Sequence, residues 1–137
     1  MPETFARPRW ARPLGAFLVL FGLLSIKEGG SVVIGDAAAV AAAGAYVPFV
    51  VWFNAIAGLA YIAAGIGIWR DTRWGAALAA AIACATVVVL AALGVHILNG
   101  GAYEMRTLAA MVFRSAVWVG VAALVARNFR AATPRLA

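Results

Sequence analysis

Two long apolar segments without a charged residue constrain the fold of this chain more than any other feature of its sequence. They comprise residues 47–69 and 74–98. A helix needs roughly 20 apolar residues to cross a bilayer, because the hydrocarbon core is about 30 Å thick and each helical residue rises about 1.5 Å. Both segments meet that length, and the break between them is only residues 70–73. They are therefore predicted to be two transmembrane helices in an antiparallel hairpin.

Two further apolar segments are interrupted by ionisable residues. Residues 13–34 contain Lys27 and Glu28, and residues 107–127 contain Arg114. The first of these segments is long enough to cross only if its two charges lie within the membrane or at its edge. With both segments included, the sequence predicts an all-α fold, an integral membrane four-helix bundle.

The composition agrees with a membrane protein. Of the 137 residues, 66% are hydrophobic and 12% are charged, whereas soluble domains are about half apolar and about a quarter charged. A chain this short could not bury so much apolar surface in its own core, so lipid must cover the rest. We therefore expect a single membrane domain over residues 1–137, with the lipid bilayer as a partner.

Basic residues flank the predicted helices mainly on one side. Their three clusters are Arg7, Arg9 and Arg12; Arg70 and Arg73; and Arg127, Arg130 and Arg135. Since basic loops stay in the cytoplasm, this pattern predicts an N-in/C-in topology with basic cytoplasmic tails. The Ala-rich segment 35–46 is too short to cross, so we expect an outer loop with a short interfacial helix there. The expected location is the bacterial cytoplasmic (inner) membrane, as a multi-pass protein.

Several other functions are excluded by what the sequence lacks. The net charge of +6 does not indicate nucleic-acid binding, because no basic stripe interleaves with aromatic residues outside the membrane segments. A single histidine cannot ligate haem from both sides, and Cys84 lies about 18 Å from His96 along the predicted helix, too far to share a zinc ion. No phosphate loop, dinucleotide fingerprint or hydrolase elbow is present. We therefore predict no catalytic and no metal-binding residues, and do not expect an enzyme on its own.

Glycines recur at regular spacing in the first two predicted helices. Gly15, Gly22 and Gly29 follow one another every seven residues, and Gly58 and Gly65 have the same spacing. Small residues let helix backbones approach closely in lipid, where the hydrophobic effect does not drive association. The pattern predicts a smooth packing face on each helix, with chance spacing in an Ala-rich chain as the alternative.

The polar residues within the predicted helices carry the most information about function. An ionisable side chain at the centre of a membrane helix costs roughly 2.5–3.5 kcal/mol. Counting about 1.5 Å per residue from the outer helix ends places several of these residues roughly 10 Å deep. The candidates for ligand binding or for a charge network are Lys27, Glu28, Asn54, His96, Glu104, Arg106 and Arg114. They predict a polar pocket in the outer leaflet that opens outward.

In this hypothesis Glu28 and Glu104 neutralise the three basic residues, while His96 and Asn54 complete the hydrogen bonds. Three interpretations of the polar layer remain open. The basic side chains could snorkel to the surface without a function. The charges could pair as a structural lock that fixes the helix register. Alternatively, the layer could bind a ligand, a proton or a quinone.

Two motifs in the first two predicted helices resemble the DoxX-like family of membrane proteins. They are Gly22-Leu-Leu-Ser-Ile-Lys27 and Asn54-Ala-Ile-Ala-Gly58, the latter followed by Gly65-Ile-Gly67-Ile-Trp69-Arg70. The similarity in order and spacing extends over about residues 14–127, although Asn54 stands where an acidic residue is common in the family. The resemblance implies a four-helix bundle associated with quinol oxidation or with membrane redox complexes.

These observations favour an accessory or structural subunit of a membrane complex that is linked to redox chemistry or to quinone. Its expected partners are other membrane subunits or further copies of the chain, and no cofactor is expected other than a quinone. The alternative is a small transporter, or a proton- or ligand-binding membrane protein, that acts as an oligomer. Transport requires a polar path to the cytoplasm, and the uncharged inner halves of the two central helices argue against one.

Overall fold

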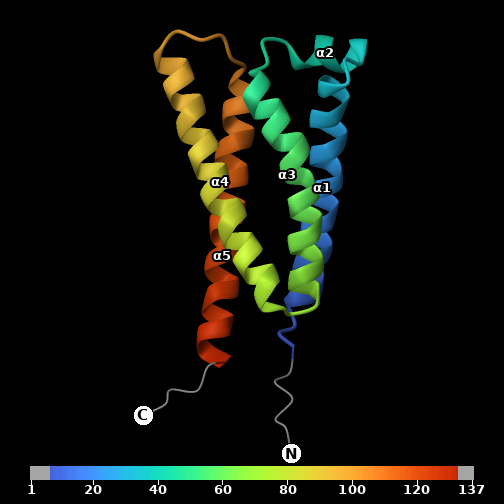
Figure 1. The fold of residues 1–137 in the computed structure, drawn as a ribbon, viewed down its shortest axis with the longest axis vertical. Coiled ribbons are helices and arrows are strands. Elements are labelled where there is room, and N and C mark those ends of the chain that lie inside the picture. Colours follow the sequence, from blue (N-terminus) through green and yellow to red (C-terminus); the bar gives the residue numbers. More distant parts are fainter. Residues whose placement is uncertain (1–6, 133–137) are drawn as a thin grey trace, which may run out of the picture.

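The computed structural model describes residues 7–132, which form five α-helices joined by short turns (Figure 1). Four of these helices are long and apolar enough to cross a membrane, so the prediction of four such helices is confirmed. The fifth is a short helix within the predicted outer loop. The helices are α1 (Ala11–Val33), α2 (Ala37–Ala43), α3 (Pro48–Trp69), α4 (Arg73–Leu98) and α5 (Met105–Ala132).

The helix bounds follow the apolar segments closely, with the largest difference at the end of α5. That helix continues to Ala132, whereas the apolar segment ends near residue 127. Hydropathy predicts the part of a helix that lies in lipid, and a helix can continue into water beyond it. Arg127 and Arg130 lie on this polar extension of α5, and Arg135 of the same predicted cluster lies outside the described residues.

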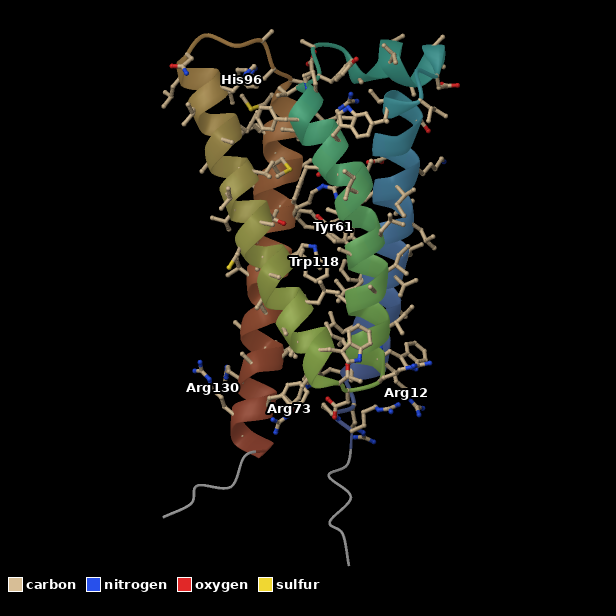
Figure 2. The ribbon with its side chains drawn as sticks, in the orientation of Figure 1. Arg12, Tyr61, Arg73, His96, Trp118 and Arg130 are labelled. Carbon is tan, nitrogen blue, oxygen red and sulfur yellow. The ribbon has the colours of Figure 1, made fainter. Side chains whose placement is uncertain are left out.

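The two ends of the bundle differ in chemistry. Figure 2 shows Arg12, Arg73 and Arg130 together at one end, which also carries the α3–α4 turn and which we call the arginine end. The opposite end carries α2 and the α4–α5 turn, and we call it the α2 end. The arginine end is the one that the sequence predicts to be cytoplasmic, and this orientation stays a prediction.

Helices α1 and α3 pack most closely of all the helix pairs, because glycines face one another across their interface. A Cβ added to Gly22 would lie 2.6 Å from the carbonyl oxygen of Gly58, and one added to Gly15 would lie 2.6 Å from that of Gly65. No side chain fits in that space, so the predicted glycine faces pack directly on each other.

The core is not continuous along the bundle. Near its middle and toward the arginine end, all four long helices contribute to one buried cluster that contains Leu18, Tyr61, Ala83 and Trp118. Toward the α2 end a second cluster joins α3, α4 and α5 through Val50, Leu93 and Met111, with no buried residue from α1. Figure 1 accordingly shows the ends of α3 and α5 close together at the α2 end, with α1 apart from them.

Candidate functional site

A cavity of about 450 Å³ lies near the α2 end, where α1 and α5 are apart. Its walls come from α1, α3 and α5, and alanines of α2 cover it. Half of the sixteen lining residues are small and apolar. The polar and charged lining residues are Lys27, Glu28, Ser31, Tyr46, Asn54, Arg106, Thr107 and Arg114. Five of the seven predicted candidates therefore surround one pocket, and His96 and Glu104 do not line it.

Arg114 is the most buried charge in this pocket, with 7% of its surface exposed. Its Nη1 donates a hydrogen bond to the Ser25 hydroxyl at 2.6 Å, and that hydroxyl donates to the carbonyl oxygen of Phe21 at 2.9 Å. The guanidinium carbon lies 5.1 Å from the centre of the Phe21 ring, a cation–π contact. These contacts fix Arg114 of α5 against α1. Its buried Nε has no hydrogen-bond partner.

Asn54 is the second residue with an unmet hydrogen-bonding atom at the pocket. It comes from α3 and its buried Oδ1 has no partner. Buried polar atoms in proteins are hydrogen-bonded in the large majority of cases, because an unpaired one costs about 1–3 kcal/mol. The pocket thus presents an unused donor, Arg114 Nε, and an unused acceptor, Asn54 Oδ1.

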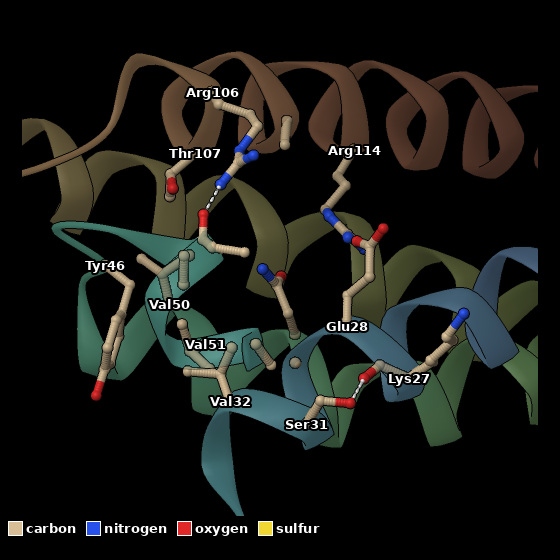
Figure 3. A pocket seen from close by; sticks show the side chains of 16 residues that line it. Lys27, Glu28, Ser31, Val32, Tyr46, Val50, Val51, Arg106, Thr107 and Arg114 are labelled. Carbon is tan, nitrogen blue, oxygen red and sulfur yellow. Dashed lines mark hydrogen bonds between the residues drawn. The ribbon is translucent and has the colours of Figure 1, made fainter. Parts of the chain in front are cut away.

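The acidic residues do not neutralise the basic ones in the predicted way. Figure 3 shows the Glu28 side chain directed across the pocket toward Arg114, but the hydrogen bond of the guanidinium goes to Ser25. Arg106 donates from Nη2 to the carbonyl oxygen of Ala42 at 2.7 Å (Figure 3). Glu104 accepts from the backbone N–H of Ala45 at 2.9 Å. Neutral groups therefore take the places of the predicted ionic partners.

The contacts of Arg106 and Glu104 hold α2 and the loop after it to the start of α5. Ala42 lies in the last turn of α2, where carbonyl groups lack a helical partner and carry partial negative charge. Gly44 follows with φ +64°, a left-handed conformation that favours glycine. A Cβ there would press on Glu104, so this glycine lets the carboxylate approach the backbone. Glu104 thus positions the cover of the pocket without lining it.

His96 lies apart from the pocket, in the last turn of α4. Its Nε2 is 3.0 Å from the carbonyl oxygen of Ala102, and its ring meets that of Phe49 edge-on with centroids 6.1 Å apart. The sequence analysis grouped it with the other polar residues from its predicted depth alone. Depth gives no direction around the helix axis, and α4 is not among the helices that line the cavity.

Three buried residues with polar atoms near the predicted candidates were missed by the sequence analysis: Ser25, Tyr61 and Trp118. Tyr61 and Trp118 are fully buried, with ring centroids 4.8 Å apart, and neither the Tyr61 hydroxyl nor the Trp118 Nε1 has a partner. Helical spacing could have indicated them, because Trp118 lies four residues after Arg114 and Tyr61 lies seven after Asn54. Each is thus on the same helix face as a predicted candidate, one or two turns toward the arginine end.

Comparison with known proteins adds no relative to this picture, because no family model, curated protein or solved structure matches the chain. The function is therefore inferred from the pocket itself. Its lining combines hydrogen-bonding and positively charged groups with small apolar side chains, a combination suited to binding an amphipathic molecule.

Proposed function

We propose that this protein binds a small amphipathic molecule in the pocket and acts as an accessory subunit of a membrane complex. The polar part of the ligand would meet Arg114 and Asn54, and its apolar part would extend between α1 and α5 toward lipid. The observation that carries this proposal is the pair of buried atoms without a partner, Arg114 Nε and Asn54 Oδ1, at a cavity of about 450 Å³. A bound ligand would supply the missing partners of both.

In this proposal the arginine end faces the cytoplasm of a bacterium and the pocket lies in the outer leaflet of the inner membrane. Support comes from the positive-inside rule, since the described arginines of the three predicted clusters flank the ends of α1, α3, α4 and α5 that lie together. The many exposed large apolar side chains on α1, α3, α4 and α5 offer surface to lipid and to neighbouring subunits.

A quinone is one ligand of the proposed class, and it would link the protein to a redox complex. This part of the proposal depends on the resemblance to the DoxX-like family, whose members are associated with quinol oxidation. The pocket chemistry is compatible with it, because a quinone carbonyl accepts a hydrogen bond from a donor such as Arg114 Nε, and the hydroxyl of the reduced quinol can donate to Asn54 Oδ1.

The experiment that tests the proposal compares two tryptophan substitutions one residue apart. Ala110 lines the pocket, while Ala109 is exposed on another face of α5. Purified wild type, Ala110→Trp and Ala109→Trp would be extracted and their bound small molecules identified by mass spectrometry. We expect an amphipathic molecule with wild type and Ala109→Trp, and its loss with Ala110→Trp. Identical extracts from all three proteins would refute the proposal.

Transport is the second candidate function, and the buried Tyr61–Trp118 pair favours it. These two residues place polar atoms on the arginine side of Arg114, which lengthens the polar path beyond the pocket. Farther along, Ala64, Ile68, Val121 and Val125 belong to the packed core and close the path. Binding is therefore supported better than passage, and wild type in liposomes should not increase the rate of proton leak over that of empty liposomes.

A further inference from the structure

We infer that the pocket selects an amphiphile with an oxyanionic head group, a carboxylate or a phosphate, and that Arg114 is its counter-ion. This inference rests on the proposed function, because it names the class of ligand that the same pocket takes. It differs from the quinone expectation in one property, the negative charge of the head group.

The first support is the edge of the Arg114 guanidinium that remains available. Nη1 is held by the Ser25 hydroxyl, which fixes the plane of the group, while Nε has no partner. The N–H groups of Nε and Nη2 point in parallel from the opposite edge. Carboxylates and phosphates accept two parallel N–H groups of arginine at once, whereas a single carbonyl oxygen takes fewer.

The second support is the balance of charge around the cavity. Lys27, Arg106 and Arg114 line it, and Glu28 is its only acidic lining residue within the described chain. A positive charge at membrane depth is costly unless a negative charge lies nearby. A neutral quinone would leave this excess in place, whereas a head group with a negative charge would reduce it.

The third support is the route into the pocket. Alanines of α2 cover the cavity, and Arg106 and Glu104 hold that cover to α5 through the carbonyl of Ala42 and the N–H of Ala45. The core cluster near this end includes no residue of α1, and the cavity is lined by residues of both α1 and α5. An amphiphile can enter between them from the lipid with its tail still in the membrane.

Glu28 distinguishes anion binding from a structural lock, because its carboxylate is directed toward Arg114 (Figure 3). If an anion binds at Arg114, Glu28 repels it, and Glu28→Gln should strengthen binding several-fold. If Glu28 and Arg114 instead form a structural lock, Glu28→Gln should weaken the fold and leave binding of anions unchanged.

The experiment uses the full chain in nanodiscs of phosphatidylcholine and measures bound molecules by native mass spectrometry. The probes are oleate, phosphatidylglycerol, oleyl alcohol and decylubiquinone. We expect at least one of the two anionic probes to bind about ten-fold more tightly than oleyl alcohol and decylubiquinone, since a charge-assisted pair exceeds a neutral hydrogen bond by roughly this factor. Whether oleate or phosphatidylglycerol binds identifies the source of the oxyanion.

Two variants separate this inference from the proposed function. Arg114→Gln should abolish the preference for anionic probes, whereas Arg127→Gln, outside the pocket, should keep it. Equal or tighter binding of the neutral probes, with displacement by Ala110→Trp, would overturn the oxyanion inference and leave the proposed function standing. Failure of Ala110→Trp to displace any probe would overturn both.

Discussion

The two halves of this bundle use the same four helices in opposite ways. In the half toward the arginine end, the four long helices share one core, and Trp118 and Tyr61 are fully buried in it. In the half toward the α2 end, α1 leaves the core, and polar residues of α1, α3 and α5 surround a cavity. One densely packed half can therefore hold the helices in place, while the other half accommodates a cavity with a buried charge in its wall.

The largest expected difference in stability comes from truncating one side chain in each half. Trp118→Ala should destabilise the protein by about 3–5 kcal/mol, because it leaves a large cavity in the shared core. Val51→Ala, at the pocket wall, should cost less than about 1 kcal/mol, since its side chain borders space that is already open. Unfolding of the detergent-solubilised variants by increasing SDS measures both. Equal losses would show that the two halves are packed alike.

The next prediction concerns the buried charge of Arg114 in the pocket half. Its replacement by an apolar side chain should not destabilise the protein as truncation in the core does. Arg114→Met replaces a buried guanidinium, whose hydrogen bond goes to a neutral hydroxyl, by an apolar side chain of similar length, and so removes the cost of keeping a charge away from water. We expect the SDS unfolding midpoint to stay or rise while ligand binding is lost. A fall in stability comparable to that of Trp118→Ala would instead identify Arg114 as part of a structural lock.

The contrast between the halves also explains what the sequence could and could not predict. The four long helices follow from apolar segments, which lipid demands of any spanning helix. The common level of Lys27, Asn54 and Arg114 follows from counting residues along helices of known rise. The pocket formed by these residues, by contrast, depends on which helices are neighbours and how they are rotated.

Residues were misplaced or missed mainly where their contacts depend on how a helix is rotated around its axis. His96 was placed with the pocket because its depth fits, yet α4 does not line the cavity. Glu104 was expected to meet a cation, yet it meets the backbone of a loop distant in sequence. Ser25 was missed because a serine in an apolar helix ordinarily bonds to its own backbone, and here it also accepts from Arg114.

A smaller effect tests the polar atoms without a partner in the packed half. Tyr61→Phe removes a buried hydroxyl that has no partner, so the free energy of unfolding should stay the same or rise by about 1 kcal/mol. The matched control is Ser25→Ala, which removes a hydroxyl with two hydrogen bonds and should lower stability by about 1–2 kcal/mol. If Tyr61→Phe is the more destabilising of the two, the Tyr61 hydroxyl has a hydrogen-bond partner when the protein is in the membrane. The polar path would then extend into the packed half.

The smallest effect on global stability should come from the cover of the pocket, where the expected change is local. Arg106→Gln removes the hydrogen bond to the Ala42 carbonyl, worth about 0.5–1.5 kcal/mol. Since α2 is a short helix with no buried residue, this loss should release α2 without unfolding the four long helices. Hydrogen exchange followed by mass spectrometry should show faster exchange at residues 37–45, with α1 and α3 unchanged. Arg127→Gln, at the other end of α5, removes the same charge and should leave exchange of α2 as in wild type. Slower or unchanged exchange in Arg106→Gln would mean that α2 is held by lipid or by other contacts within the protein. The cover of the pocket would then be as rigid as the core of the packed half.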